Sequence, residues 1–221
     1  MTAQDKQQLA EARDQTSDAL RKERYHHGDL RECLIEATRR LVEDKGADKF
    51  SVSEACRLAG VSTAAPYKHF RDRNDMLVAM VIAGMMRHRE RMFAAIKDLP
   101  SGSPLRIKAL GQEYVDFALN EPGVFRLKFG GYTDRLTDPQ LEEIGQATFE
   151  IVLREVAACL GQTDITADVR QRGFMLWSFV HGLSFLLHDQ KLSDMGGDID
   201  LDFMLGDIAE RILTDGAPVR R

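Results

Sequence analysis

The stretch that decides the fold of this protein is residues 50–77, which read FSVSEACRLAGVSTAAPYKHFRDRNDML. Ser51 and Glu54 have the spacing of a capping box and therefore predict the start of a short helix. Gly60 follows in a tight turn, and Ser62 is placed to cap a second short helix. Two short helices joined by such a turn form the helix-turn-helix pattern, whose second helix enters the major groove of DNA.

Helical spacing continues on both sides of this stretch. Apolar residues recur at helical intervals from Leu30 to Leu41, and the pattern stops before Gly46, which tolerates a left-handed helix cap. The sequence shows no alternating strand pattern and no internal repeat. It therefore predicts an all-α protein, with helices over about residues 29–45, 51–59, 62–70, 73–99, 103–120, 124–129, 139–160, 166–190 and 200–213.

Composition places the chain among ordinary globular proteins. It has 221 residues, a formal net charge of −5 and 43% hydrophobic residues, enough for one helical domain and a small module. The three cysteines form no CxxC pair, which disfavours a disulfide framework and a zinc ribbon. Cys33 and Cys56 are expected in the core. Residues 1–20 lack an apolar signal segment and 174–187 is too short to span a bilayer, so we expect a cytoplasmic protein away from the membrane.

The net acidity does not exclude a nucleic-acid partner, because one module can do the binding. Residues 21–75 carry 12 basic and 10 acidic side chains, whereas the rest of the chain carries 18 and 25. The basic segment 21–27 can lie along a DNA backbone or enter a minor groove, or it can be a solvated charge run. Residues 1–24 are polar and are expected to form a mobile arm.

The second helix of the motif carries groups that suit DNA. Thr63 and Ala64 are small enough for a helix N-terminus to approach base edges. Tyr67, Lys68 and His69 can donate hydrogen bonds to phosphate oxygens. The plainer alternative is a helical hairpin whose polar residues are only solvated.

Residues 25–77 resemble the DNA-binding domain of the TetR/AcrR family of transcriptional regulators, most specifically through the run YKHFRDRNDML at 67–77. The resemblance implies that Tyr67 and His69 grip the DNA backbone. One departure from the usual family pattern is Pro66, which lacks an N–H and forfeits a backbone hydrogen bond, a loss tolerated early in a helix. The candidate DNA-binding residues are Ser51, Ser53, Ser62, Thr63, Ala64, Tyr67, Lys68 and His69.

Residues 174–187 are the second informative segment. This helix is apolar on so much of its circumference that it must be buried on more than one side, which suits an internal pocket on one face and a second subunit on another. The motif WSFVHG at 177–182 resembles the Trp-x-x-x-His-Gly signature of a TetR C-terminal subclass. That resemblance covers residues 104–213 and implies a ligand-binding and dimerisation domain.

The pocket and the interface each have candidate residues. The pocket candidates are Phe117, Phe125, Phe129, Phe149, Met175, Trp177, His181 and Phe185. The interface candidates are Leu176, Val180, Leu183, Leu187, Leu201, Met204, Leu205, Ile208 and Ile212. The aromatic residues would serve equally well as core, and His181 can be either a ligand contact or a buried histidine hydrogen-bonded within the core.

Signatures of an enzyme are missing from the sequence, which contains no P-loop, dinucleotide fingerprint, GxSxG or HExxH. Pairs such as His88 and Glu90 have ordinary helix-surface spacing, so neither a metal nor a cofactor is expected. The expected organisation is an arm over 1–24, a DNA-binding domain over 25–75 and a ligand-binding and dimerisation domain over 76–221.

These observations favour a homodimeric repressor that binds a palindromic double-stranded DNA operator and is released by a small apolar effector. The helix over residues 73–99 joins the two domains and is the natural element to carry the response. Two alternatives remain open: a DNA-binding regulator without a ligand, and a helical dimeric scaffold that recruits a protein partner.

Overall fold

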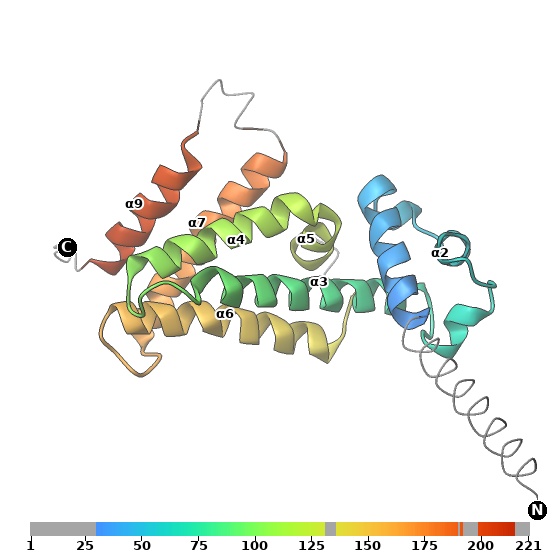
Figure 1. The fold of residues 1–221 in the computed structure, drawn as a ribbon, viewed down its shortest axis with the longest axis horizontal. Coiled ribbons are helices and arrows are strands. Elements are labelled where there is room, and N and C mark those ends of the chain that lie inside the picture. The colour runs from blue at the N-terminus through green and yellow to red at the C-terminus, as the bar shows by residue number, and fades with distance from the viewer. Residues whose placement is uncertain (1–29, 131–135, 190, 192–198, 215–221) are drawn as a thin grey trace, which may run out of the picture. The chain divides into compact units, whose positions relative to one another are not determined.

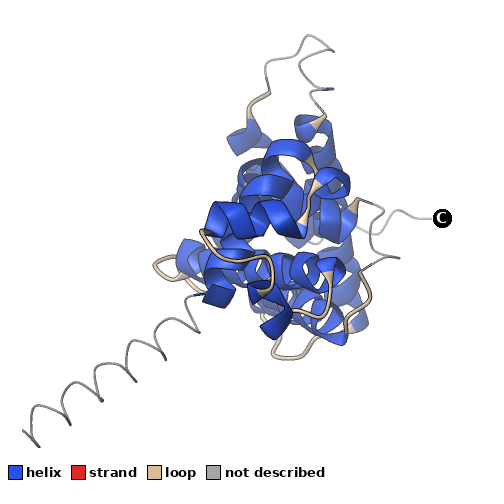
Figure 2. Ribbon diagram, turned by 90° about the vertical axis from the view of Figure 1, so that its right-hand side faces the viewer, coloured by secondary structure: helices blue, strands red, loops and turns tan. Residues whose placement is uncertain are grey.

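The computed structural model describes residues 30–130, 136–189, 191 and 199–214. The arm expected over 1–24 lies outside these residues. Figure 2 shows helices and loops without a strand in the described part of the chain, which confirms the all-α prediction. The chain divides into two compact units, Met1–Leu77 and Val78–Arg221.

The N-terminal unit is built from short helices and the start of a long one. Residues 30–45 are helical, and η1 (Ala47–Lys49), α2 (Val52–Ala59), η2 (Ala65–Lys68) and the beginning of α3 (Arg73–Ile96) follow. The predicted capping box is present at the start of α2, where the Ser51 hydroxyl accepts the Glu54 N–H at 3.3 Å. Gly60 ends α2 with φ 71°, a left-handed conformation that glycine adopts without a steric penalty.

The segment expected to be the second helix of the motif is a 3₁₀ turn, so the predicted α-helix over 62–70 is wrong in kind and extent. Ala64 occupies the N-cap of η2, and the Ser62 carbonyl accepts the Ala65 N–H at 3.1 Å. In an α-helix this carbonyl would pair with residue 66, but Pro66 has no N–H to donate. The shorter i to i+3 hydrogen bond takes its place.

In its described residues, the C-terminal unit holds the rest of α3 and five further helices, whose predicted limits are close to those observed. These helices are α4 (Pro104–Asn120), α5 (Pro122–Phe129), α6 (Pro139–Cys159), α7 (Ala167–His188) and α9 (Leu201–Leu213). Side chains that accept a backbone N–H begin four of them, namely Ser103, Asp138, Thr166 and Asp200. The long helix α3 ends at Ile96, earlier than the predicted residue 99.

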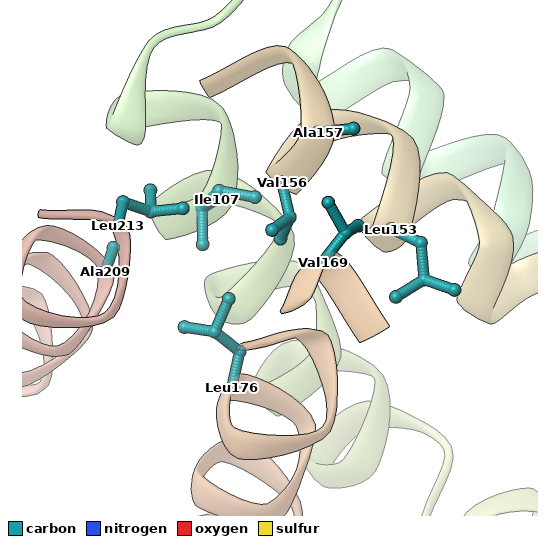
Figure 3. Packing of buried hydrophobic residues seen from close by; sticks show 8 residues of the cluster. All are labelled: Ile107, Leu153, Val156, Ala157, Val169, Leu176, Ala209 and Leu213. Carbon is teal, nitrogen blue, oxygen red and sulfur yellow. The ribbon is translucent and has the colours of Figure 1, made fainter. Parts of the chain in front are cut away.

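The core of this unit is organised around α4, which contacts α5, α6, α7 and α9 (Figure 1). Figure 3 shows one buried cluster to which α4, α6, α7 and α9 all contribute. Its members are Ile107, Leu153, Val156, Ala157, Val169, Leu176, Ala209 and Leu213. A second cluster joins Met92 and Ile96 of α3 to Leu110 of α4 and Ile151 of α6. Apolar burial of this kind supplies most of the stabilisation of a helical domain.

Two kinds of feature are absent from the described residues. No helix among them is both long and apolar enough to cross a bilayer. No group of three or more His, Cys, Asp or Glu side chains in the same part of the chain is arranged to hold a metal ion.

Candidate functional site

The turn formed by η2 exposes one set of side chains and buries another. Thr63, Tyr67 and Lys68 are exposed, and the Tyr67 side chain is 65% accessible. Pro66 and Phe70 are buried. Because the buried pair fixes the turn on the unit, the exposed side chains are presented on a rigid support rather than on a loose loop.

Two arginines link the residues that follow this turn to the rest of the N-terminal unit. Arg73, at the start of α3, donates from Nε to the Phe50 carbonyl at 3.0 Å and from its guanidinium to the Ala47 carbonyl. The Arg31 guanidinium lies over the Phe70 ring at 5.4 Å from the ring centroid. These contacts tie the first residues of α3 and the end of the η2 turn to the rest of the N-terminal unit.

The two serines expected to contact DNA differ in their environment. The Ser51 hydroxyl donates to Glu54 Oε2 at 2.7 Å, so its proton is used at the helix start, whereas Ser53 is exposed. Lys45 Nζ lies 2.6 Å from the same carboxylate oxygen, and the bonds from Lys45 and Ser51 lower the pKa of Glu54. The remaining DNA candidates are also at the surface: Ser62 and Ala64 are exposed, and His69 is half-buried.

The C-terminal unit contains a cavity of about 260 Å³ with an almost entirely apolar lining. Four of its helices and the end of α5 contribute to the walls. The lining residues are Met85, His88, Met92, Tyr114, Phe129, Gly145, Gln146, Thr148, Phe149, Val152 and Trp177. A smaller cavity of about 50 Å³ shares Met92, Tyr114, Val152 and Trp177 with it.

A partly buried group of ionisable side chains lies beside the cavity. His88 of α3 is 1% exposed, and its Nδ1 lies 3.2 Å from Glu113 Oε1 of α4. Arg91 Nε donates to the same oxygen at 2.7 Å and reaches Glu121 at 3.1 Å. Arg87 donates to Glu121 at 2.5 Å. Burial alone would raise the pKa of Glu121, but the hydrogen bonds and charges of Arg87 and Arg91 outweigh it and lower that pKa.

A second polar group joins α4 to α7. Trp177 Nε1 donates to the Tyr114 hydroxyl at 3.3 Å, and this hydroxyl lies 2.7 Å from His181 Nδ1. Burial raises the pKa of the Tyr114 hydroxyl and lowers the pKa of His181, so both side chains are held in their neutral forms. His181 is therefore hydrogen-bonded within the protein. The sequence had left two interpretations open, a ligand contact and a histidine hydrogen-bonded within the core, and this contact is the one that the second interpretation required.

The predicted pocket residues fall into three groups. Phe129, Phe149 and Trp177 line the larger cavity. Phe117 and Phe125 are fully buried, and Phe185 and His181 pack against the Phe125 ring with centroids 5.1 and 5.8 Å away. Met175 is 47% exposed, so the structure places it on the surface rather than at the cavity wall.

Several cavity residues were not anticipated. Met85, His88 and Met92 come from one face of α3, and the spacing of i, i+3 and i+7 was the signal that could have found them. The pairing of His88 with Glu90 as surface residues was wrong, because His88 is buried and contacts Glu113. Cys33 was also misplaced: it is exposed, whereas Cys56 is buried as expected.

Two family models match this chain. Residues 34–80 match the model of bacterial regulatory proteins of the tetR family, and residues 107–212 match the model of the tetracyclin repressor-like C-terminal domain. The chain belongs to the TetR family. It is a TetR-family transcriptional regulator with a helix-turn-helix DNA-binding domain followed by a helical C-terminal domain. The subclass suggested by the WSFVHG motif stays a prediction.

The chain is also similar to two named proteins. The HTH-type transcriptional regulator BetI of Escherichia coli is 23% identical over 154 residues, which cover 69% of this chain and 79% of BetI. The nucleoid occlusion factor SlmA of Vibrio cholerae is 29% identical over 135 residues, which cover 57% of this chain and 67% of SlmA.

Solved structures share the fold. A protein of unknown function from Rhodococcus sp. RHA1 gives a TM-score of 0.72 at 29% identity, covering 86% of this chain and 96% of that one. The transcriptional regulator FadR of Bacillus subtilis, solved in complex with stearoyl-CoA, gives 0.62 at 16% identity and covers 83% and 97%. At that identity the second likeness concerns the fold alone.

TetR-family regulators act as dimers, and the structure revises which residues of this chain are available for that purpose. Leu176, Val180, Leu183 and Leu205 are at most 9% exposed and belong to the core of the protomer, so they cannot also form the surface of a subunit contact. The other interface candidates are half-buried: Leu187, Leu201, Met204, Ile208 and Ile212. They pack against the same clusters.

Proposed function

We propose that this TetR-family regulator is a repressor that binds operator DNA as a homodimer and leaves it when a small, largely apolar ligand enters the 260 Å³ cavity. The proposal rests mainly on one observation: part of the cavity wall is formed by α3. Met85, His88 and Met92 line the cavity, and the same helix begins at Arg73 in the unit that carries the helix-turn-helix. A ligand that favours one placement of α3 can therefore alter the DNA-binding unit.

The exposed side chains of η2 support the DNA-binding half of the proposal. Tyr67 and Lys68 offer a phenol and an ammonium group at the surface, and both donate hydrogen bonds to phosphate oxygens in protein–DNA complexes. Thr63 and Ala64 are exposed just before them and are small enough to sit against base edges.

Exposed apolar side chains on α7 and α9 support a homodimer. Phe174, Met175 and Leu186 of α7 are 48%, 47% and 43% exposed, and Phe203 of α9 is 65% exposed. Large apolar side chains in such numbers on two neighbouring helices favour a buried contact with another subunit. Gly182, also exposed on α7, has open space around it and allows a partner helix to come close. A two-fold axis would repeat this contact on both protomers.

Release by a ligand follows from the geometry of a palindromic operator. Two recognition segments have to lie about 34–36 Å apart to enter successive major grooves on one face of DNA. A ligand that binds better to a dimer with a different spacing weakens operator binding, by a coupling free energy of about 1–3 kcal/mol in typical allosteric proteins. Helix α3 is the element that would transmit the change.

A salt titration of DNA binding tests the proposal. The wild-type protein is titrated with the intergenic duplex beside its own coding sequence and with an unrelated duplex of equal length. We expect tight, selective binding to the first, with an affinity that falls steeply as salt rises. Weak and equal binding to both duplexes would argue against this operator, and no binding even at low salt would support the scaffold alternative.

A further inference from the structure

His88 brings an unusual buried polar atom to the cavity wall. Its side chain is 1% exposed, it stacks on Phe117 with ring centroids 4.4 Å apart, and it is one of the residues that line the cavity. Nδ1 is engaged with Glu113, but Nε2 has no hydrogen-bond partner among the residues that the structure describes. A buried polar atom without a partner costs free energy unless a bound molecule completes it.

The contacts of Nδ1 define what Nε2 can offer. The carboxylate of Glu113 only accepts hydrogen bonds, so Nδ1 must carry the proton in this contact. In a neutral imidazole, a proton on Nδ1 leaves Nε2 with a lone pair and makes it an acceptor. A cationic ring would add a third positive charge to a group in which Arg87 and Arg91 already match Glu113 and Glu121.

Three other polar side chains of the lining already have hydrogen-bond partners. Thr148 donates to the Ile144 carbonyl at 2.6 Å, and Tyr114 and Trp177 bond to one another. Gln146 is exposed, at the solvent side of the wall. Among the described residues, the lining includes neither lysine nor arginine. Lys128 Nζ lies beside the lining residue Gly145, but it donates to the Leu141 carbonyl at 2.7 Å, so the wall is poorly suited to a carboxylate or a phosphate.

The volume limits the size of an occupant. An engineered cavity of about 150 Å³ holds one benzene molecule. In proportion, the cavity of about 260 Å³ accommodates about ten non-hydrogen atoms, a single ring with a short substituent.

We propose that the cavity takes a neutral, ring-sized, largely apolar molecule whose hydroxyl or N–H group donates a hydrogen bond to Nε2 of His88. The inference deepens the proposed function, on which it rests, by giving the effector a chemical class: small phenols, alcohols and neutral amides rather than carboxylates or phosphate esters. Glu113 acts as the positioning residue, because it holds the Nδ1 proton and so keeps Nε2 as the acceptor.

Three probes of nearly equal size test the donor requirement on the wild-type protein. They are 4-propylphenol, 1-fluoro-4-propylbenzene, which lacks the donor, and 4-methylbenzoate, which is an anion. Trp177 is the single tryptophan of the chain and lines the cavity, so its fluorescence reports binding, with calorimetry as an independent check. We expect the phenol to bind about tenfold more tightly than the fluoro compound, and the benzoate to bind most weakly.

Two variants assign the effect to His88. In His88→Phe the ring can still stack on Phe117 but offers no acceptor, so the preference for the phenol over the fluoro compound should disappear. Met80→Leu is a change of similar volume at a buried position of the same helix, outside the cavity lining, and should keep the preference. The comparison of probes on the wild type needs no variant, so it tests the requirement for a hydrogen-bond donor even if His88→Phe does not fold.

The outcomes separate this inference from the proposed function. Equal affinity of the phenol and the fluoro compound, tightest binding of the benzoate, or no binding of any probe to the folded protein would each overturn the inference. A protein that prefers the phenol but binds no DNA would overturn the repressor proposal and leave the His88 assignment standing. A protein that binds its operator but none of the probes would be a regulator without this ligand site.

Discussion

The Tyr114 hydroxyl lies 2.7 Å from His181 Nδ1 and joins α4 to α7 through a partly buried hydrogen bond. The indole of Trp177 only donates, so the Tyr114 oxygen accepts from it, and the Tyr114 O–H donates to His181 Nδ1 in the tautomer that leaves this nitrogen unprotonated. This arrangement places the remaining imidazole proton of neutral His181 on Nε2. The WSFVHG motif therefore has a structural use in this chain, because its Trp and His both bond to one residue of another helix.

Replacing Tyr114 with Phe should destabilise the C-terminal unit. The substitution leaves the Trp177 N–H and the His181 Nδ1 without their partner, and we expect a loss of about 1–2 kcal/mol in the free energy of unfolding. Urea denaturation followed by Trp177 fluorescence measures it. Tyr67→Phe, on an exposed side chain, is the matched control and should leave stability within about 0.5 kcal/mol. Equal stability of both variants and the wild type would show that the hydrogen bonds of Tyr114 contribute nothing to the free energy of unfolding.

The stability of the protein should fall in mild acid because of His181. Burial lowers the pKa of His181 in the folded state from its ordinary value of 6.5, so the unfolded chain binds more protons as pH falls through this range. The unfolding free energy is therefore expected to decrease between about pH 8 and about pH 5. His188 shifts in the same direction, so a smaller dependence should remain in His181→Gln. Urea midpoints over this pH range measure both proteins, and parallel curves would contradict the assignment to His181.

Removing the charge of Lys68 should weaken DNA binding without regard to sequence. If its ammonium contacts one phosphate, Lys68→Ala reduces the slope of log affinity against log salt by about one. Fluorescence anisotropy at several salt concentrations measures this slope. Lys97→Ala removes the same charge from an exposed position in the C-terminal unit and should leave the slope unchanged. Similar slopes for Lys68→Ala and wild type would remove Lys68 from the interface.

Gly84 permits the close approach of α3 and α5, so Gly84→Ala should be destabilising. A Cβ at this position would lie 2.6 Å from a methyl group of Val124, which is fully buried. We expect a cost of about 1–3 kcal/mol from overpacking. In the double variant with Val124→Ala the clash is relieved, and the total loss should be smaller than the sum of the two single losses. Simple additivity in urea denaturation would show that the helices adjust without strain.

A charge on the exposed face of α7 should dissociate the proposed homodimer. Leu186→Glu places a carboxylate on a side chain that is 43% exposed in the protomer, and we expect the dimer Kd to rise about tenfold or more. Sedimentation velocity over a range of concentrations measures the equilibrium. Leu105→Glu, at a similarly exposed position of α4, is the control and should stay dimeric. If both variants remain dimeric, the subunit contact lies on another surface.

Much of the fold could be predicted from the sequence because its helix starts are encoded locally. The expected cap Ser51 accepts a backbone N–H in the structure, and so do Ser103 and Thr166, at which two further helices were predicted to begin. Such signals depend on a few neighbouring residues and need no tertiary context. The η2 turn is the exception, although its cause, the missing N–H of Pro66, was itself visible in the sequence.

The candidate site was predicted less completely, because the sequence of a helical face does not show which element the face packs against. Leu176 and Val180 repeat as an interface stripe would, yet their partners are in the same chain. Phe117 and Phe129 are equally plausible pocket residues by composition, but one is fully buried in the core and the other lines the cavity. Periodicity shows that a face is buried and leaves its partner unspecified.

The sequence by itself determined that the chain is helical, where its helices begin, and that residues 50–77 form a turn-containing DNA-binding motif. Only the tertiary structure decided which residues form the cavity and that His88 meets Glu113. Those two residues are far apart along the chain and meet because α3 and α4 pack together. Helix starts are fixed by hydrogen bonds within a few residues, whereas a cavity and its polar atoms exist only where separate helices fail to fill the space between them.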